Sequence, residues 1–275
     1  MATYPPGVST IELNADLGEG VGADAAALDA GLLRLITSAN VACGGHAGDR
    51  ESMSRVCALG ADYGVAIGAH VSYLDLEGFG RRRLDVSPSL LTAQLIKQVE
   101  TLDDVARTCG TRVTYVKPHG ALYNAAADDD AIAMAVVNAV SAFNAVTNPE
   151  LGGGLALLGL AGSRLQDAAR VRGLAYVPEG FADRAYTPSA RLVPRSVDGA
   201  VIHNRTDVTA QAIRIALDGE VISIDGSLVS VTARSLCVHG DTPDAVDLLA
   251  HVRDALWKRG LTLSAFAPPP NRDDS

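Results

Sequence analysis

The sequence predicts an α/β protein built around a parallel sheet. Short apolar runs alternate with helical patterns along most of the chain, which is typical of parallel strands joined by helices in right-handed crossovers. At 275 residues the chain fits one domain of this class, so we expect a single unit with its core over about 10–260 and flexible termini. No Gly-x-Gly-x-x-Gly motif follows the first run, which argues against a conventional dinucleotide site.

The apolar runs are expected to form seven core strands, and strands alternating with helices predict a parallel arrangement. Seven strands can close into an imperfect barrel or remain an open doubly wound sheet. The strands are expected over about 10–14, 37–43, 65–70, 112–117, 154–160, 174–178 and 235–239, with a separate β pair over 221–224 and 228–231.

Capping residues mark where several helices should begin. Asp24, Asp49 and the Ser87-Pro88 pair are typical starts for helices over about 25–36, 50–62 and 87–108. Asp128 is expected to open a helix that runs to about 146 and ends before Asn148-Pro149. Further helices are expected over 162–171, 207–218 and 243–258, an irregular stretch over 178–206, and a frayed tail from Ala267 onward.

Composition narrows the class of protein. Apolar residues make up 48 % of the chain, and the formal net charge is −9, which argues against a nucleic-acid partner. The four cysteines lack Cys-x-x-Cys spacing and are expected to be reduced thiols. Without a signal-like start or an apolar stretch of roughly 20 residues, we expect a soluble cytoplasmic protein with no membrane partner.

Polar side chains gather where the predicted strands end. Parallel α/β sheets place their ligands beyond the carboxyl ends of the strands, so these side chains should converge on one mouth and form an enzyme site. They are Asn14, Asp16 and Glu19 after the first run, and His46, His70, His119 and His239 after later runs.

Several chemistries are open to this group. Asp16, His70 and His119 could supply three metal ligands and leave positions for water, or one histidine could transfer protons. His46 stands in a small-residue loop before a helix N-terminus, which favours an anion. The alternatives are structural: Asp16 and Glu19 could cap turns, and the histidines could bond backbone groups.

The basic residues also allow two interpretations. Lys117 at a strand end could hold a phosphate or carboxylate, act as a base, or simply pair with Glu179. The cluster over 81–83 could clamp an anion or lie in a solvated loop. Glu179, Asp183, Arg184 and Arg195 could form a lid or a partner surface, or only structural ion pairs. His203 and His251 receive no functional role.

Together these segments resemble the LamB/YcsF family. The resemblance covers about residues 11–255, and the sequence departs from the family pattern at Gly45, Arg50, Val71 and Leu74, which concerns loop shape and substrate fit. It rests on the segments 13–19, 38–49, 68–70, 78–82, 117–124, 179–186 and 238–243. The resemblance implies a distorted seven-stranded parallel β/α barrel like those of glycoside hydrolases and deacetylases.

The resemblance also implies a reaction, the ATP-dependent opening of the 5-oxo-L-proline lactam to L-glutamate, with two partner subunits, B and C. ATP, with Mg²⁺, is expected at the level of that complex; metal binding and homo-oligomerisation stay open. Asp16 or a histidine would activate water, while Lys117 and Arg82 would hold carboxylate or phosphoryl oxygens. The expected catalytic set is Asp16, His46, His70, Lys117 and His119, and the expected binding set is Asn14, Glu19, Asn40, Asp49, Arg81, Arg82, Tyr123, Glu179, Asp183, Arg184 and His239.

Two rival functions remain at this stage. One is a metal-dependent amino-sugar deacetylase with Asp16, His70 and His119 as metal ligands. The other is a non-catalytic scaffold subunit that only presents partners with a folded barrel.

Overall fold

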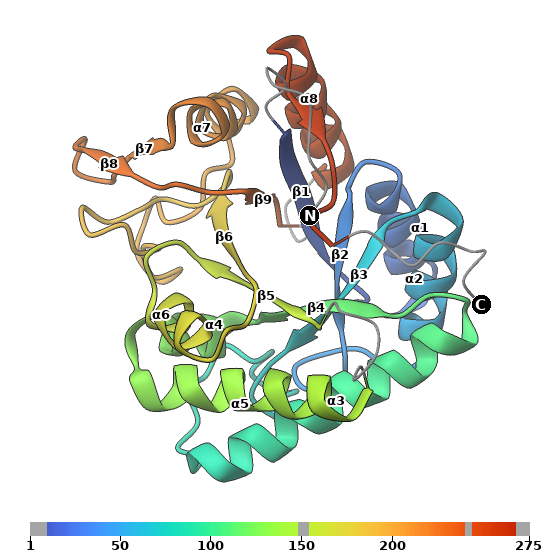
Figure 1. Ribbon diagram of the computed structural model, residues 1–275. Helices are drawn as coiled ribbons and strands as arrows, with labels where there is room; N and C mark the ends of the chain where they lie inside the picture. Colours follow the sequence, from blue (N-terminus) through green and yellow to red (C-terminus); the bar gives the residue numbers. More distant parts are fainter. Residues whose placement is uncertain (1–9, 148–153, 240–243, 268–275) are drawn as a thin grey trace.

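A closed parallel barrel lies at the centre of the computed structural model, which describes residues 10–147, 154–239 and 244–267 (Figure 1). Each barrel strand pairs in parallel with its neighbour, and the last strand pairs with the first, so the sheet closes instead of staying open. The predicted seven-stranded barrel is therefore confirmed. Its strands are β1 (Thr10–Leu17), β2 (Ser38–Ala42), β3 (Ala66–Val71), β4 (Val113–Pro118), β5 (Ala156–Leu160), β6 (Tyr176–Phe181) and β9 (Ser235–Cys237).

Helices surround the barrel and bury their apolar faces against it (Figure 1). Leu32, Val56, Leu95 and Leu249 are among the helical side chains that complete one continuous core with the outward-facing strand residues. The helices are α1 (Gly22–Leu33), α2 (Arg50–Tyr63), α3 (Pro88–Thr108), α4 (Gly120–Asp128), α5 (Asp130–Thr147), α6 (Arg164–Val171), α7 (Arg205–Asp218) and α8 (Ala245–Lys258).

Two of the predicted helix starts are confirmed by their hydrogen bonds. Asp49 caps α2 by accepting a bond from the Ser52 amide (2.8 Å), and Ser87 caps α3 with Pro88 in the first turn. The start proposed at Asp24 is wrong, because α1 begins after Val21 and Asp24 lies inside its first turn. Caps are local features, so sequence patterns identify them well when the capping side chain makes its bond.

The predicted helix start at Asp128 is also wrong. Asp128 ends α4, a helix that the sequence did not reveal, and the Asp129 carboxylate then accepts bonds from the first amides of α5. Because α4 begins directly at the end of β4 and has no side-chain cap, it carries no start signal. The helix end proposed at Asn148-Pro149 lies outside the described residues, as do 240–243 and the tail from Pro268.

Two strand boundaries change where site residues lie. β1 continues to Leu17, so Asp16 is a strand residue and not a loop residue. β6 is displaced toward the C-terminus and includes Glu179. The unpredicted β10 (Thr262–Leu263) extends the edge of β1, whereas the predicted outer pair is present as β7 (Glu220–Ile222) and β8 (Leu228–Ser230).

The long stretch after β6 is irregular, as predicted, with only isolated bridges between Arg184 and Val201 and between Tyr186 and Leu192.

In the described ranges, no single helix is long and apolar enough to cross a membrane. Only α4 and α5 taken together have the length and composition of a span, and they are bent by 113° at their junction.

A buried carboxyl group lies inside the barrel at Glu12 on β1. Glu12 is 1 % exposed and accepts a hydrogen bond from Ser235. Because burial disfavours the carboxylate, the pKa of Glu12 is raised from 4.5 to about 7. The folded protein therefore retains a proton that the unfolded chain releases at lower pH.

Replacing Glu12 by Gln should change how stability depends on pH. A carboxyl whose pKa rises on folding stabilises the native state fully below pH 4.5, and this contribution is lost as the pH rises to about 7. The neutral amide of Glu12→Gln has no such loss. The variant should therefore gain about 3 kcal/mol relative to the wild type between about pH 4 and about pH 8, measured by denaturant unfolding.

The matched control is Glu77→Gln, which changes a carboxyl group whose side chain is 92 % exposed and should follow the wild type at both pH values. A difference between Glu12→Gln and the wild type that stays constant across this range contradicts the assignment.

Candidate functional site

A cavity of about 510 Å³ lies at the carboxyl end of the barrel strands. Strand-end residues form its floor, α4 forms one wall, and the irregular segment after β6 forms another. A volume of this size is typical of small-molecule sites. The polar lining residues are Asp16, Glu19, His70, Arg81, Lys117, His119, Tyr123, Asn124, Asp128, Arg184, Arg191, Arg195, Ser196 and His239.

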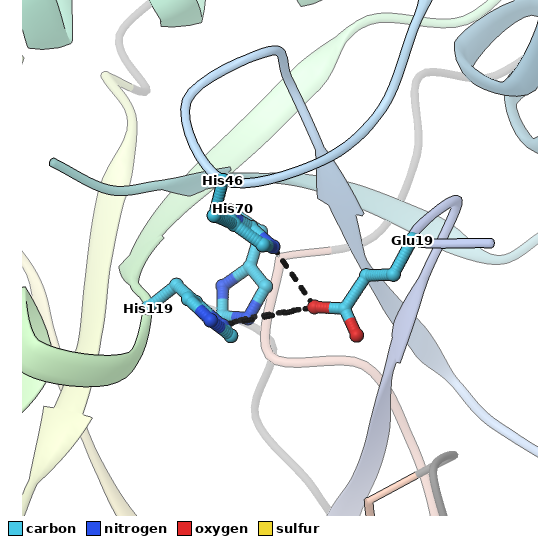
Figure 2. Close-up of side chains that lie close together, drawn as sticks. All are labelled: Glu19, His46, His70 and His119. Carbon is cyan, nitrogen blue, oxygen red and sulfur yellow. Dashed lines mark hydrogen bonds and ion pairs between the residues drawn. The ribbon is translucent and has the colours of Figure 1, made fainter. Parts of the chain in front are cut away.

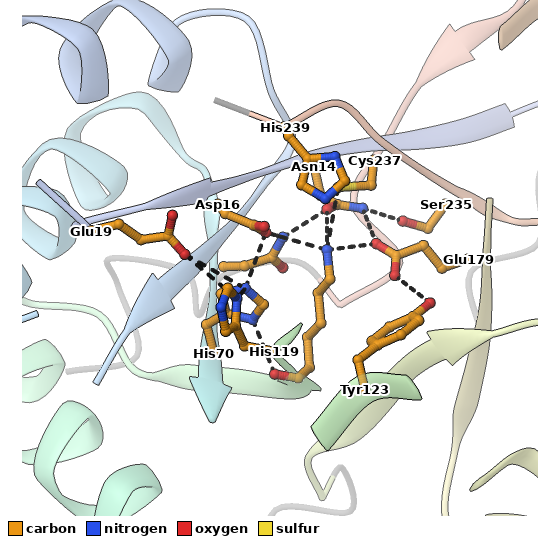
Figure 3. Close-up of polar contacts among 12 residues, drawn as sticks. Asn14, Asp16, Glu19, His70, His119, Tyr123, Glu179, Ser235, Cys237 and His239 are labelled. Atoms are coloured by element: carbon orange, nitrogen blue, oxygen red, sulfur yellow. Dashed lines mark hydrogen bonds and ion pairs between the residues drawn. The ribbon is translucent and has the colours of Figure 1, made fainter. Parts of the chain in front are cut away.

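The centre of the floor is the ammonium group of Lys117 on β4. Its side chain is 2 % exposed, and Nζ lies 2.8 Å from Glu179 Oε1 and 3.3 Å from Asp16 Oδ1. It also donates to Asn14 Oδ1 (3.2 Å) and lies 3.3 Å from Cys237 Sγ. Figure 3 shows Asn14, Asp16, Glu179 and Cys237 converging from β1, β6 and β9. The Lys117–Glu179 pair, one of the open interpretations, is therefore present.

The charges in this cluster stabilise one another. Burial alone would raise the pKa of Asp16, but His70 and Lys117 together hold it well below its usual range. Burial likewise opposes the ammonium group, yet the carboxylates of Asp16 and Glu179 raise the pKa of Lys117 well above its usual value. Lys117 is thus a fixed cation and not a base with suppressed charge.

Amide side chains hold Asp16 in place from beneath. Asn40 Nδ2 donates to Asp16 Oδ1 (2.9 Å) and to Asn14 Oδ1 (2.7 Å), and the Tyr115 hydroxyl donates to Asn40 (2.7 Å). Tyr115 lies against Gly68, where any side chain would overlap the ring. Within the described residues, the hydrogen bonds of Asp16 all go to Oδ1, so Oδ2 is able to accept from a ligand in the cavity.

Three histidines and a glutamate form a second cluster beside the first (Figure 2). His46 Nε2 lies 2.9 Å from Glu19 Oε1, and His119 Nδ1 lies 3.0 Å from His70 Nε2. The rings of His46 and His119 are stacked with centroids 3.7 Å apart. His70 also contacts Asp16 Oδ1 (3.3 Å), which joins the two clusters.

Backbone carbonyls fix the orientation of two imidazole rings. His70 Nδ1–H donates to the carbonyl of Lys117 (3.1 Å), and His119 Nε2–H donates to the carbonyl of Phe79 (3.0 Å). The other nitrogen of each ring, His70 Nε2 and His119 Nδ1, therefore faces the cluster. Burial lowers the pKa of His46 to about 3 and lowers the pKa of His119 as well. These two rings are neutral at neutral pH.

His239 forms a separate pair with Asp183. Its Nδ1–H lies 2.9 Å from Asp183 Oδ2, and the same carboxylate accepts the His239 backbone N–H (3.0 Å). Burial opposes the imidazolium, but the Asp183 carboxylate outweighs it and raises the pKa of His239. A ring nitrogen of His239, an oxygen of Asp16 and Cys237 Sγ lie within 4.8 Å of one another.

Arginine side chains give the cavity rim a positive field. Arg81, Arg184, Arg191 and Arg195 all line it. Arg184 is anchored to the carbonyls of Val193 (2.6 Å) and Ala200 (3.2 Å), while Arg191 bonds Asp128 (2.7 Å). In a chain with a net charge of −9, this concentration of cations favours an anionic ligand.

The structure brings most of the expected site residues together. Nine line the cavity: Asp16, Glu19, His70, Arg81, Lys117, His119, Tyr123, Arg184 and His239. Five support the lining from behind: Asn14, Asn40, His46, Glu179 and Asp183. Tyr123 bonds Glu179 through its hydroxyl group (2.8 Å).

Two expected binding residues lie elsewhere. Asp49 uses its carboxylate to cap α2, and the guanidinium of Arg82 pairs with Asp75, so neither side chain lines the cavity. The expected contact of Arg82 with substrate is therefore corrected. Gly45, where the sequence departs from the family pattern, faces Ser72 and Gln98, which already fill the space that a side chain would need.

Sequence reasoning missed Arg191, Phe79 and the position of Cys237. Arg191 and Arg195 flank a short apolar stretch containing Pro194 in the irregular segment, and this spacing was the only available signal. Phe79 acts through its carbonyl group and has a positive φ of 53°, which no pattern of side chains reveals.

Comparison with known proteins gives consistent matches. A model of the LamB/YcsF family matches residues 11–270. The A subunit of the 5-oxoprolinase of Streptomyces coelicolor is 51 % identical over 257 residues, which cover 94 % of this chain and 100 % of that protein. The protein of the same name from Kocuria rhizophila is 49 % identical over 260 residues, with the same two coverages.

A solved structure is also similar. The lactam utilization protein from Thermus thermophilus superposes with a TM-score of 0.83 at 37 % sequence identity, covering 94 % of this chain and 100 % of that one. The matches in sequence and in structure thus cover the same share of this chain, 94 %.

Proposed function

This chain belongs to the LamB/YcsF family, and from that premise we propose that it is the A subunit of a 5-oxoprolinase, a hydrolase that opens the lactam ring of 5-oxo-L-proline to L-glutamate. The observation that carries the proposal is about 50 % identity to relatives of that name over their whole length. The site adds independent support, because its charged floor and cationic rim suit a small anionic amide.

The cavity matches the chemistry of the substrate. A five-membered lactam carries one carboxylate, one ring N–H and one carbonyl oxygen, and it fills only part of about 510 Å³. Arg191 and Arg195 on the wall offer partners for the carboxylate, and the apolar surface of Phe181 suits the ring carbons. The remaining volume has room for a phosphoryl group on the carbonyl oxygen.

We propose that ATP hydrolysis overcomes the resistance of an unstrained amide. The γ-phosphoryl group of ATP, with Mg²⁺, moves to the lactam carbonyl oxygen, and ADP leaves. Water then adds to the carbonyl carbon, the C–N bond breaks, and its electron pair stays on nitrogen, which takes a proton. A second water hydrolyses the resulting acyl phosphate to glutamate and phosphate. Two further subunits are expected to take part, and this chain would supply the ring-opening site.

Two residues whose pKa values are shifted in opposite directions suit the ring-opening step. Asp16 is held ionised and offers Oδ2 to the cavity, so it can orient the attacking water and accept its hydrogen. The Asp183 carboxylate raises the pKa of His239, so at pH values below that pKa the ring can donate a proton to the leaving nitrogen. Pairs of groups whose pKa values are displaced in opposite directions are typical of acid–base catalysis.

Reconstitution tests this function directly. The chain is mixed with its two partner subunits, ATP and 5-oxoproline, and glutamate and ADP are followed together. Glutamate formation should require every component. Asp16→Asn should lower kcat at least about 100-fold, because it removes the carboxylate that orients water.

Asp24→Asn, on the exposed surface of α1, is the matched control and should retain wild-type kcat. Full activity in both the Asp16→Asn and His119→Asn variants would refute catalysis at this mouth and favour a scaffold subunit. Release of acetate from an N-acetylated amino sugar without ATP would favour a deacetylase.

The pH profile of the reconstituted enzyme tests the role of His239. If protonated His239 is the acid, kcat is retained below its raised pKa and falls as the pH rises through it. Asp183→Asn removes the carboxylate that stabilises the imidazolium, so this alkaline limb should move to lower pH. His239→Asn should lower kcat and remove the limb.

Asp183→Asn is nearly isosteric, and thermal unfolding of the same samples verifies that the variants are folded. An alkaline limb that stays in place in Asp183→Asn contradicts the assignment of His239 as the acid.

A further inference from the structure

We propose that Glu19, His46, His70 and His119 bind one divalent transition-metal ion of the zinc class beside the lactam cavity. The proposal goes beyond the lactam reaction, because it stands on the geometry of these four side chains alone. It also replaces the ligand set expected from the sequence, which contained Asp16 in place of Glu19 and His46.

The spacing of the four ligand atoms fits a tetrahedral ion. Zinc lies about 2.0–2.1 Å from nitrogen and oxygen ligands, which places the ligands roughly 3.4 Å from one another. The separations here are 2.9 Å for His46–Glu19, 3.0 Å for His70–His119, 3.7 Å for His119–Glu19 and 3.9 Å for His70–Glu19. All four atoms lie within 4.8 Å of one another, and Figure 2 shows the side chains converging.

The hydrogen bonds outside the cluster direct ring nitrogens into it. His70 Nδ1 and His119 Nε2 each donate to a carbonyl oxygen, so His70 Nε2 and His119 Nδ1 face each other at 3.0 Å and both are turned into the cluster. Two ring nitrogens at this distance are joined either by a shared proton or by a metal ion. A shared proton can join only two of the converging atoms, whereas one metal ion accepts all of them.

The surroundings resemble the outer shell of a metal site. Metal-bound histidines usually donate their second N–H to a carbonyl or carboxylate, which is how Lys117 and Phe79 hold two of these rings. His46 is held by its stack on His119 and by an edge contact with Phe79. The three histidine side chains are at most 8 % exposed, so water competes little for their nitrogens.

The neighbouring cluster of Asp16, Cys237 and His239 provides a contrast. Lys117 Nζ already lies 3.3 Å from both Asp16 Oδ1 and Cys237 Sγ, so that cluster contains its own cation. We therefore expect one metal ion per chain and not two. Three imidazoles with one carboxylate favour zinc and similar ions over Mg²⁺ or Ca²⁺, which prefer oxygen ligands.

Metal titration of the purified full-length chain tests the proposal without substrate or partner subunits, so its outcome is separable from that of the lactam assay. The protein is stripped with a chelator, checked by elemental analysis, and titrated calorimetrically with Zn²⁺. The wild type should bind one ion, and His119→Asn and Glu19→Gln should each weaken binding at least about 100-fold. Zn²⁺ should raise the Tm of the wild type but not that of His119→Asn.

His239→Asn and His203→Asn are the matched controls and should still bind one ion with wild-type affinity. Visible absorption of the Co²⁺-loaded wild type should show the intense bands of four-coordinate cobalt, and His119→Asn should lose them. The proposal is overturned if the stripped wild type binds no stoichiometric Zn²⁺, if His119→Asn binds like the wild type, or if His239→Asn loses binding as fully.

Discussion

The rest of the site depends on the buried ammonium group of Lys117. Asp16 and Glu179 carry charge beside it, and Asn14 and Cys237 complete its surroundings. These residues come from β1, β6 and β9, so one cation joins the first strand to the two that close the barrel. Removing one partner from a buried charge pair typically costs about 3–5 kcal/mol, because the other charge stays buried without compensation. The ion pairs of Lys117 therefore both stabilise the closed barrel and hold the charged groups of the site in place.

Asp16 links two regions of different electrostatic character. On one side its Oδ1 contacts the fixed positive charge of Lys117, and on the other it contacts His70 within a group of imidazoles. His46 and His119 in that group are neutral because they are buried. Asp16 thus lies between a fixed cation on one side and buried imidazole rings on the other.

The sequence predicted those features that depend on local patterns. Strand–helix alternation indicated the barrel, and the caps at Asp49 and Ser87 indicated two helix starts. Strand-end histidines identified the mouth because parallel strands end on one side. The helix α4 lacks a capping side chain and β10 has only two residues, so neither leaves a pattern. Arg82 pairs with Asp75 instead of lining the cavity, and Arg191 lines the cavity instead. Both outcomes depend on contacts between folded loops, which the spacing of residues in the sequence does not reveal.

Polar and apolar residues alternate along β1, and the polar ones contribute to the site. Glu12, Asn14 and Asp16 contact the interior network, while Leu13 and Ala15 between them belong to the core shared with the helices. Side chains of a strand change face at every residue. Along this one row the pKa of the carboxyl group changes from raised at Glu12 to lowered at Asp16. Inserting or deleting one residue within β1 would therefore turn apolar side chains toward the interior network and remove Asn14 and Asp16 from it.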